Sequence, residues 1–241
     1  NSSISFNTNK EVTLENSIAN QLTNLVFNET MANSLTKEEY ITFSENLKSE
    51  FNVTMLNPLS NELKVMRQSL LFSGLESISY NINRKNSSLK LYEFGKTYHK
   101  YEKGYQEDKH LTLFVSGAKT KDSWTHVSKN SDFFYLKGIV MSILERIGVT
   151  NLKTSPVKSD LFSEGIAFSL GKNKLVEFGV INKRVLKEFG ITQEVLFADF
   201  DWKSLNEISG KKKIKVSSLL KFPSVKRDLA LLIDEKVTFK E

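Results

Sequence analysis

The spacing of apolar residues predicts an amphipathic helix near the start of the chain. Four apolar side chains recur there at intervals of four, four and three residues: Leu14, Ile18, Leu22 and Leu25. This spacing places them on one face of a helix that runs from about Val12 to Phe27. An apolar face of this width must pack against another element.

Two further segments have the pattern of buried helices. In residues 71–82 the apolar positions again share a face, and Gly74 lies on the same stripe. Glycine costs helix propensity, so we expect it to allow close packing against a neighbour. Residues 133–147 are strongly amphipathic, with Asp132 as the expected N-cap and Gly148 at the position that usually ends a helix. Two shorter helices are expected, one begun by Thr36 and one at 183–189.

The remaining apolar runs predict strands. They are rich in β-branched and aromatic residues and are bounded by turn residues, at 51–56, 89–95, 110–116, 166–170, 175–181 and 195–201. The glycine in residues 171–174 predicts a hairpin turn. Because helices and strands do not alternate regularly, we expect an α+β fold with an antiparallel or mixed sheet flanked by helices.

Composition narrows the class of protein. The chain has 241 residues, of which 39% are hydrophobic, and this is enough for a sizeable core. It contains no cysteine and no apolar run of the roughly 20 residues that span a bilayer, so we expect a cytoplasmic protein without membrane contact.

Basic residues are in excess, with a formal net charge of +6, and this excess is concentrated near the end of the chain. Four lysines there could contact RNA phosphates: Lys211, Lys212, Lys213 and Lys215. The alternative is a solvated linker, which is favoured because no aromatic residue is interleaved to stack on bases.

No catalytic constellation is found. The three histidines lack the spacing of a zinc site, and Gly-x-Ser-x-Gly, Walker-type and Gly-x-Gly-x-x-Gly motifs are absent from the sequence. We therefore expect no catalytic, cofactor-binding or metal-binding residue in this chain. Trp124 and Trp202 are interpreted as core or interface anchors rather than as platforms for bases.

Longer blocks resemble a known family. Residues 57–71 read NPLSNELKVMRQSLL and are followed by Gly74, by YNINR at 80–84 and by LYEFGK at 91–96. In this order and spacing they resemble the beta subunit of bacterial phenylalanine-tRNA ligase. Residues 221–230, KFPSVKRDLA, resemble the start of the ferredoxin-like anticodon-binding domain that follows in that subunit.

The resemblance implies a class II aminoacyl-tRNA synthetase-like core domain over residues 1–210 that is catalytically inactive. Residues 211–241 would be a linker and the start of the next domain, so the chain would be a fragment of a longer subunit. Where active class II domains carry a phosphate-binding arginine after the second motif, this chain has residues 98–100, Tyr-His-Lys. Where the third motif needs glycines and an arginine, residues 196–215 supply only Gly210 and lysines. Without these fixed charges, adenylation is not expected.

The resemblance also implies partners. The family assembles as a heterotetramer of two alpha and two beta subunits, and the complete enzyme uses ATP and magnesium to aminoacylate tRNA-Phe. The first helix corresponds to the motif through which these modules pack, so Leu14, Ile18, Leu22 and Leu25 are expected to contact the alpha subunit. The alternative is that this face packs on the chain's own sheet. Two other functions also stay open, an independent ATP-using ligase and a free-standing RNA-binding module.

Overall fold

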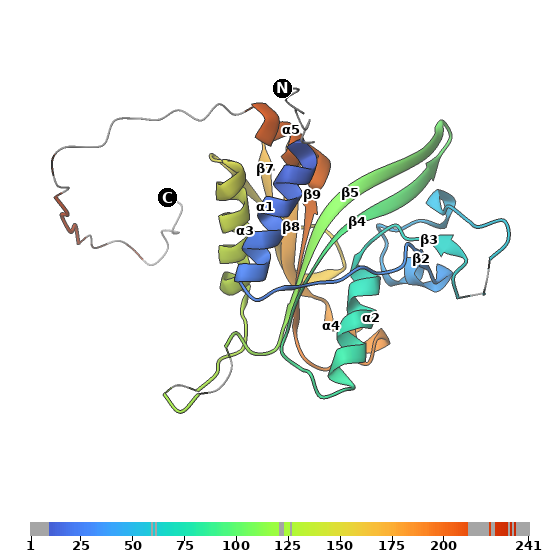
Figure 1. The fold of residues 1–241 in the computed structure, drawn as a ribbon, viewed down its shortest axis with the longest axis horizontal. Coiled ribbons are helices and arrows are strands. Elements are labelled where there is room, and N and C mark those ends of the chain that lie inside the picture. The colour runs from blue at the N-terminus through green and yellow to red at the C-terminus, as the bar shows by residue number, and fades with distance from the viewer. Residues whose placement is uncertain are drawn as a thin grey trace, which may run out of the picture.

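A seven-stranded sheet forms the centre of the computed structural model (Figure 1). The structure describes residues 10–58, 60, 62–120, 123–125, 127–211, 222, 225–230, 232 and 234. In spatial order the strands are β1 (Asn28–Glu29), β4 (Leu89–Tyr101), β5 (Gly104–Ser116), β9 (Val195–Asp201), β8 (Asn173–Ile181), β7 (Phe162–Leu170) and β6 (Lys153–Pro156). All neighbours are antiparallel except β1 and β4, so the expected α+β class with a mixed sheet is confirmed.

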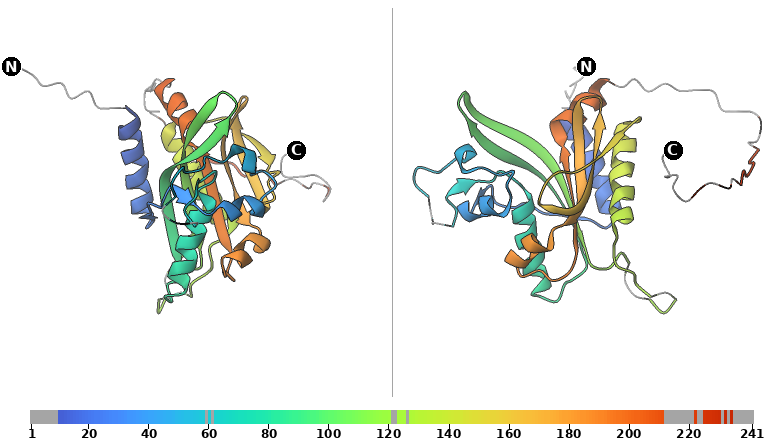
Figure 2. Two further views of the ribbon diagram at one scale, coloured as in Figure 1. Left: turned by 90° about the vertical axis from the view of Figure 1, so that its right-hand side faces the viewer. Right: turned by 180° about the vertical axis from the view of Figure 1, so that it is seen from behind.

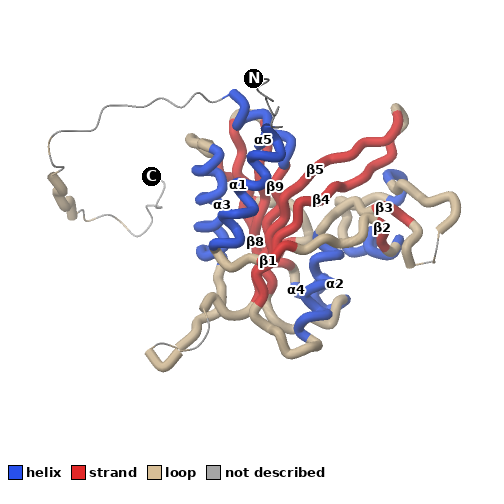
Figure 3. The backbone as a smooth tube through the Cα atoms, in the orientation of Figure 1, coloured by secondary structure: helices blue, strands red, loops and turns tan. Residues whose placement is uncertain are grey.

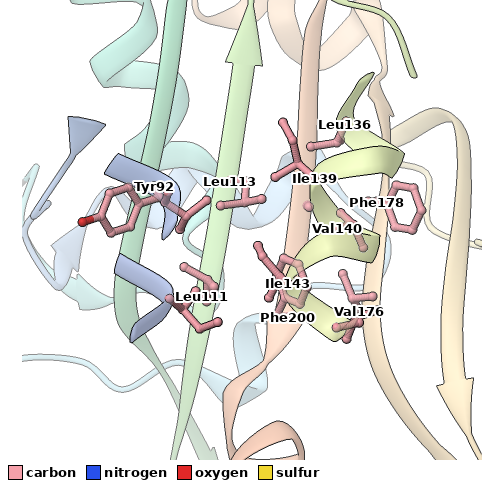
Figure 4. Packing of buried hydrophobic residues seen from close by; sticks show 14 of the residues in the cluster. Tyr92, Leu111, Leu113, Leu136, Ile139, Val140, Ile143, Val176, Phe178 and Phe200 are labelled. Atoms are coloured by element: carbon pink, nitrogen blue, oxygen red, sulfur yellow. The ribbon is translucent and has the colours of Figure 1, made fainter. Parts of the chain in front are cut away.

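Three helices cover one face of the sheet: α1 (Lys10–Asn24), α3 (Phe133–Ile147) and α5 (Trp202–Lys211). Figure 2 shows α1 and α3 in a layer beside the strands. Leu111 and Leu113 of β5, Phe200 of β9 and Phe178 of β8 meet the apolar side of α3 in one core (Figure 4). Because side chains alternate along a strand, the β5 residues that join this core are Leu111, Leu113 and Val115, all in the last part of the strand.

The other face carries α2 (Leu71–Ile82), α4 (Lys183–Glu188) and the 3-10 helix at Glu38–Phe43. Figure 3 shows α2 and α4 beside the strand ends and well away from α5. A Cβ added at Gly74 would lie 2.0 Å from the Phe114 ring, which confirms that this glycine allows close packing of α2 on the sheet. These helices cover only part of this face.

Local signals account well for α3 and for the hairpins. Asp132 Oδ1 accepts a hydrogen bond from the Tyr135 amide at 2.7 Å, and Gly148 ends α3 with φ of 85°. The turn between β7 and β8 begins at Gly171 with φ of 61°. Both arrangements are those expected from the sequence.

Two local predictions are wrong. The expected short helix is present as the 3-10 helix Glu38–Phe43, but Thr36 does not cap it. Thr36 lies in β2 (Leu35–Thr36), which pairs with β3 (Val65–Met66), and the helix has no side-chain cap bond. Residues 51–56 are not a strand of the sheet. They contain the end of the 3-10 helix Ser49–Phe51 and a single bridge between Thr54 and Val65.

The end of the chain is described only in part. Helix α5 extends to Lys211, one residue past the boundary expected at residue 210. Residues 211–241 are expected to be a linker and the start of the next domain. Of these, residues 225–230 are described and form no strand, and most of the others lie outside the described residues. None of the helices in the described part is both long and apolar enough to cross a membrane.

Candidate functional site: the uncovered polar face of the sheet

The sheet face that carries α2 has a polar half without a helical cover. There the alternating side chains of β4, β5 and β9 are polar instead of apolar. They line a cleft of about 600 Å³. Its walls are Gln68, Thr97, His99, Asp108, His110, Asn173, Lys174, Asp199, Asp201, Lys203, Ser204 and Glu207.

His110 is held at the centre of this cleft by groups on two neighbouring strands. Its Nδ1 lies 2.7 Å from Asp199 Oδ1 on β9, and its Nε2 lies 3.2 Å from Thr97 Oγ1 on β4. Burial alone lowers the pKa of the imidazole, but the carboxylates of Asp199, Asp201 and Asp108 outweigh burial and raise the pKa above its usual value. The surrounding carboxylates therefore favour the protonated form of the ring.

Arg67 is buried at the edge of this polar face. Its Nη2 lies 2.7 Å from Glu93 Oε1, and its Nε donates to the Lys96 carbonyl at 3.0 Å. A Cβ at Gly95 would lie 2.4 Å from Nη2, so the glycine in this strand is what lets the guanidinium approach. Burial raises the pKa of the Glu93 carboxyl above its usual range, against the opposing effect of Arg67. The arginine is thus neutralised inside the chain.

The cleft has an excess of negative groups. Four carboxylates line it, from Asp108, Asp199, Asp201 and Glu207, against two lysines, and Lys174 is already paired with Glu177 at 2.6 Å. No arginine is among the described residues of its lining. Carboxylates in this arrangement repel a polyphosphate. Within the described ranges no group of three or more side chains has the arrangement of a metal site.

The apolar face of α1 lies mainly inside the chain. Ile18 and Leu22 are fully buried and belong to the core formed with α3 and the sheet, and Leu14 packs at its edge. Ile18 and Leu22 therefore pack on the chain's own sheet, which was the alternative to the expected contact with a partner. Leu25 is 37% exposed and is the member of the set that is most open to solvent.

A second exposed feature at the end of α1 was missed by sequence reasoning. Val26 has φ of 65°, a left-handed conformation that is unfavourable for a β-branched residue, and it is 71% exposed. The next residue, Phe27, is buried, and Met31 beyond β1 is 95% exposed. The sequence contains no signal for this corner, because a left-handed helix end is normally marked by glycine.

The remaining site predictions have mixed outcomes. Lys211 ends α5, but Lys212, Lys213 and Lys215 lie outside the described residues. Trp202 is fully buried, as expected for a core anchor, and its ring lies 4.8 Å from that of Phe94. Trp124 is 98% exposed, so a core role for it is wrong.

The fold is that of class II aminoacyl-tRNA synthetase domains. Two solved structures of pyrrolysyl-tRNA synthetase from Desulfitobacterium hafniense superpose with a TM-score of 0.64 and cover 83% of this chain. The matched regions make up 68% and 69% of the two synthetase chains, with 16% and 15% sequence identity. At this level of identity the similarity shows the fold alone. The sequence is more specific. The model of the phenylalanyl tRNA synthetase beta chain CLM domain matches residues 2–202, and the chain belongs to this family.

Curated relatives agree with this family. The phenylalanine–tRNA ligase beta subunit of Bacteroides thetaiotaomicron is 44% identical over 95% of this chain, and that of Porphyromonas gingivalis is 39% identical over 93%. That of Desulfotalea psychrophila is 32% identical over 93%. The chain spans about 30% of the length of these relatives.

Proposed function

We propose that this chain is a non-catalytic structural part of a phenylalanine-tRNA ligase beta subunit. It would scaffold the catalytic alpha subunit and help to position tRNA-Phe for ATP-dependent aminoacylation. The observation that supports inactivity is the charge of the uncovered sheet face. Its carboxylates repel phosphate, and Arg67 is already bound to Glu93 at 2.7 Å. Transition-state charge on an α-phosphate would lack fixed positive groups there.

Titration of the chain with ATP and magnesium in a calorimeter tests this part of the proposal. We expect no saturable binding heat, whereas an independent ATP-using ligase would bind ATP in this cleft. The variant Asp199→Asn with Asp201→Asn tests the reason, because removing two carboxylates should make the cleft less repellent to ATP. Saturable binding by the unchanged chain would overturn the proposal.

The proposed alpha-subunit contact lies on the exposed side of α1 and at its corner with β1. Val12 and Leu25 are 51% and 37% exposed on α1, and Val26 and Met31 extend the apolar surface beyond the helix. Strained, exposed residues of this kind are often functional. The complete heterotetramer, cytoplasmic and dependent on ATP and magnesium, is part of the same proposal.

The tRNA contact is proposed for the lysines that follow the core: Lys211, Lys212, Lys213 and Lys215. Replacing Lys211 to Lys213 with glutamine removes three cations and should reduce the salt dependence of tRNA binding. The expected decrease is roughly 0.7 to 0.9 in the log–log slope for each lost phosphate contact. An unchanged slope would assign these residues to a linker.

A further inference from the structure

Five cations of the described residues gather at the end of the molecule away from α5. Two loops form this end, residues 83–88 and 117–130, and they are joined because the Ala118 amide donates to Ser88 Oγ at 3.1 Å. Figure 1 shows the described parts of the second loop projecting below the sheet. The cations on or beside these loops are Arg84, Lys85, Lys90, Lys119 and Lys129, and among the described residues none of them forms an ion pair.

Carboxylates are fewer at this end. Asp132 accepts the cap bond of α3, and Glu194 lies nearby because its backbone carbonyl accepts from Ser116 Oγ at 2.7 Å. The local charge is therefore positive, and it is not neutralised within the described part of the chain. Such a surface attracts a polyanion.

Two aromatic rings lie directly beside these cations. The guanidinium carbon of Arg84 is 3.3 Å from the centre of the Tyr80 ring, and Tyr80 is 58% exposed. The ammonium groups of Lys90 and Lys119 lie 5.1 and 5.0 Å from the centre of the Tyr135 ring. Rings and cations are thus interleaved, which is the arrangement missing from the lysine cluster after residue 210.

Trp124 adds a third ring to this surface. The loop that carries it is closed by backbone hydrogen bonds from Lys119 N to the Lys129 carbonyl at 2.8 Å and from Ser131 N to the Gly117 carbonyl at 2.9 Å. These bonds hold the loop base in place, while the indole is 98% exposed. An exposed tryptophan offers an aromatic face on which a base can stack.

We propose that this end of the chain, called here the Trp124 surface, binds an unpaired stretch of RNA. Its members are Trp124, Tyr135, Arg84, Lys90, Lys119 and Lys129. Cations contact the phosphates without sequence preference, and an exposed ring stacks on a base, which only an unpaired strand can offer. The inference deepens the proposed function by placing an RNA contact within the core domain, and it rests on that function only for the identity of the RNA.

The two tryptophans allow a direct test, because Trp124 is exposed and Trp202 is fully buried. A short oligoadenylate is titrated into the chain while tryptophan fluorescence is followed. Stacking on Trp124 predicts saturable quenching of the fluorescence. The variant Trp124→Phe lacks the reporting indole, so this quenching should disappear whether or not RNA still binds. Binding is therefore measured in parallel by the anisotropy of labelled RNA. Fluorescence that stays unchanged at saturating RNA would contradict stacking on Trp124.

Variants separate this surface from general charge. Trp124→Ala should weaken binding at least about fivefold, the effect of losing one stacked base. Lys119→Gln with Lys129→Gln should lower the salt slope by about 1.4, from two lost contacts to a single strand. The control Lys103→Gln with Lys172→Gln removes the same charge from exposed turns at the other end of the strands and should leave the slope nearly unchanged.

The outcomes also separate this inference from the proposed subunit role. Equal losses in the two double variants would reduce the effect to net charge and overturn the proposal. Binding of duplex RNA as tightly as single-stranded RNA would overturn it as well. If RNA does not bind but Trp124→Ala weakens association with the alpha subunit, the surface is a protein contact. Failure of subunit association with intact RNA binding would instead contradict only the proposed function.

Discussion

The guanidinium of Arg67 and the carboxylate of Glu93 form an ion pair at 2.7 Å that is almost completely buried, with 4% and 2% of their side chains exposed. The pair joins the segment before α2 to β4 beside the polar face of the sheet. Both residues therefore have structural roles, and Arg67 is not available to a phosphate group. This relationship also explains why Gly95 lies next to the pair, since a side chain there would displace the guanidinium.

Removing one partner of this pair should be strongly destabilising. Arg67→Met leaves the Glu93 carboxylate buried without its counter-charge. Glu93→Gln likewise leaves the Arg67 guanidinium buried without its counter-charge. Each change should lower the free energy of unfolding by about 3–5 kcal/mol, measured by urea denaturation. The double variant should lose much less than the sum of the two. Additive losses would show that the two charges are not coupled.

Replacement by alanine should have opposite effects on stability at Gly74, which is tightly packed, and at Gly138, which has open space around it. Gly74→Ala places a methyl group 2.0 Å from the fully buried Phe114 ring and should destabilise the chain by about 1–3 kcal/mol or more. At Gly138, in α3, a Cβ would meet no atom within 4 Å. Gly138→Ala should stabilise by up to about 1 kcal/mol through helix propensity. Thermal unfolding measures both, and a stabilising Gly74→Ala would contradict the packing described.

His110 should make stability depend on pH near neutrality. The pKa of His110 is raised in the folded chain. Its contribution to the free energy of unfolding is therefore fully present below the usual histidine pKa of about 6.5, and it is lost as the pH rises through the folded pKa. The urea midpoint should therefore fall across that window. Asp199→Asn should flatten this fall because it removes the carboxylate 2.7 Å from Nδ1.

An NMR titration of the His110 ring checks the same interpretation directly. The His110→Gln variant serves as the control for assignment of the signal and for the stability profile. A ring that titrates below about 6.5 would show that burial outweighs the carboxylates.

Val26 distinguishes folding from association. Val26→Gly relieves the left-handed conformation at φ of 65° and should leave the stability of the chain within about 1 kcal/mol of its original value. The same change removes an exposed apolar side chain and should weaken alpha-subunit association in a pull-down or by sedimentation. Asn20→Ala, on the exposed polar side of α1, is a matched surface change. Full association by Val26→Gly would remove Val26 from the proposed contact.

The parts of the fold that sequence reasoning predicted are those with local signals. Asp132 and Gly148 mark both ends of α3, and Gly171 marks the turn between β7 and β8. The far halves of β4 and β5 were missed because most of their side chains are polar. β4 continues to Tyr101, well beyond the apolar run. Pairing between the strands, which is not local, is what stabilises these halves.

The candidate site could not be predicted in the same way. Thr97, His110 and Asp199 are distant in sequence and come together only through the register of β4, β5 and β9. Similarly, the spacing of Ile18 and Leu22 correctly predicts a shared helix face. It cannot tell whether that face meets the chain's own sheet or a partner, because both require the same apolar stripe.

The central claim is that this domain contributes structure without activating an amino acid, and adenylate formation tests it most directly. Phenylalanine-dependent exchange of labelled pyrophosphate into ATP is measured for the chain alone and for the catalytic alpha subunit together with the complete beta subunit. The account predicts no exchange above background for the chain alone and clear exchange for the complete enzyme. Exchange by the purified chain that follows its concentration and saturates with phenylalanine would contradict the account.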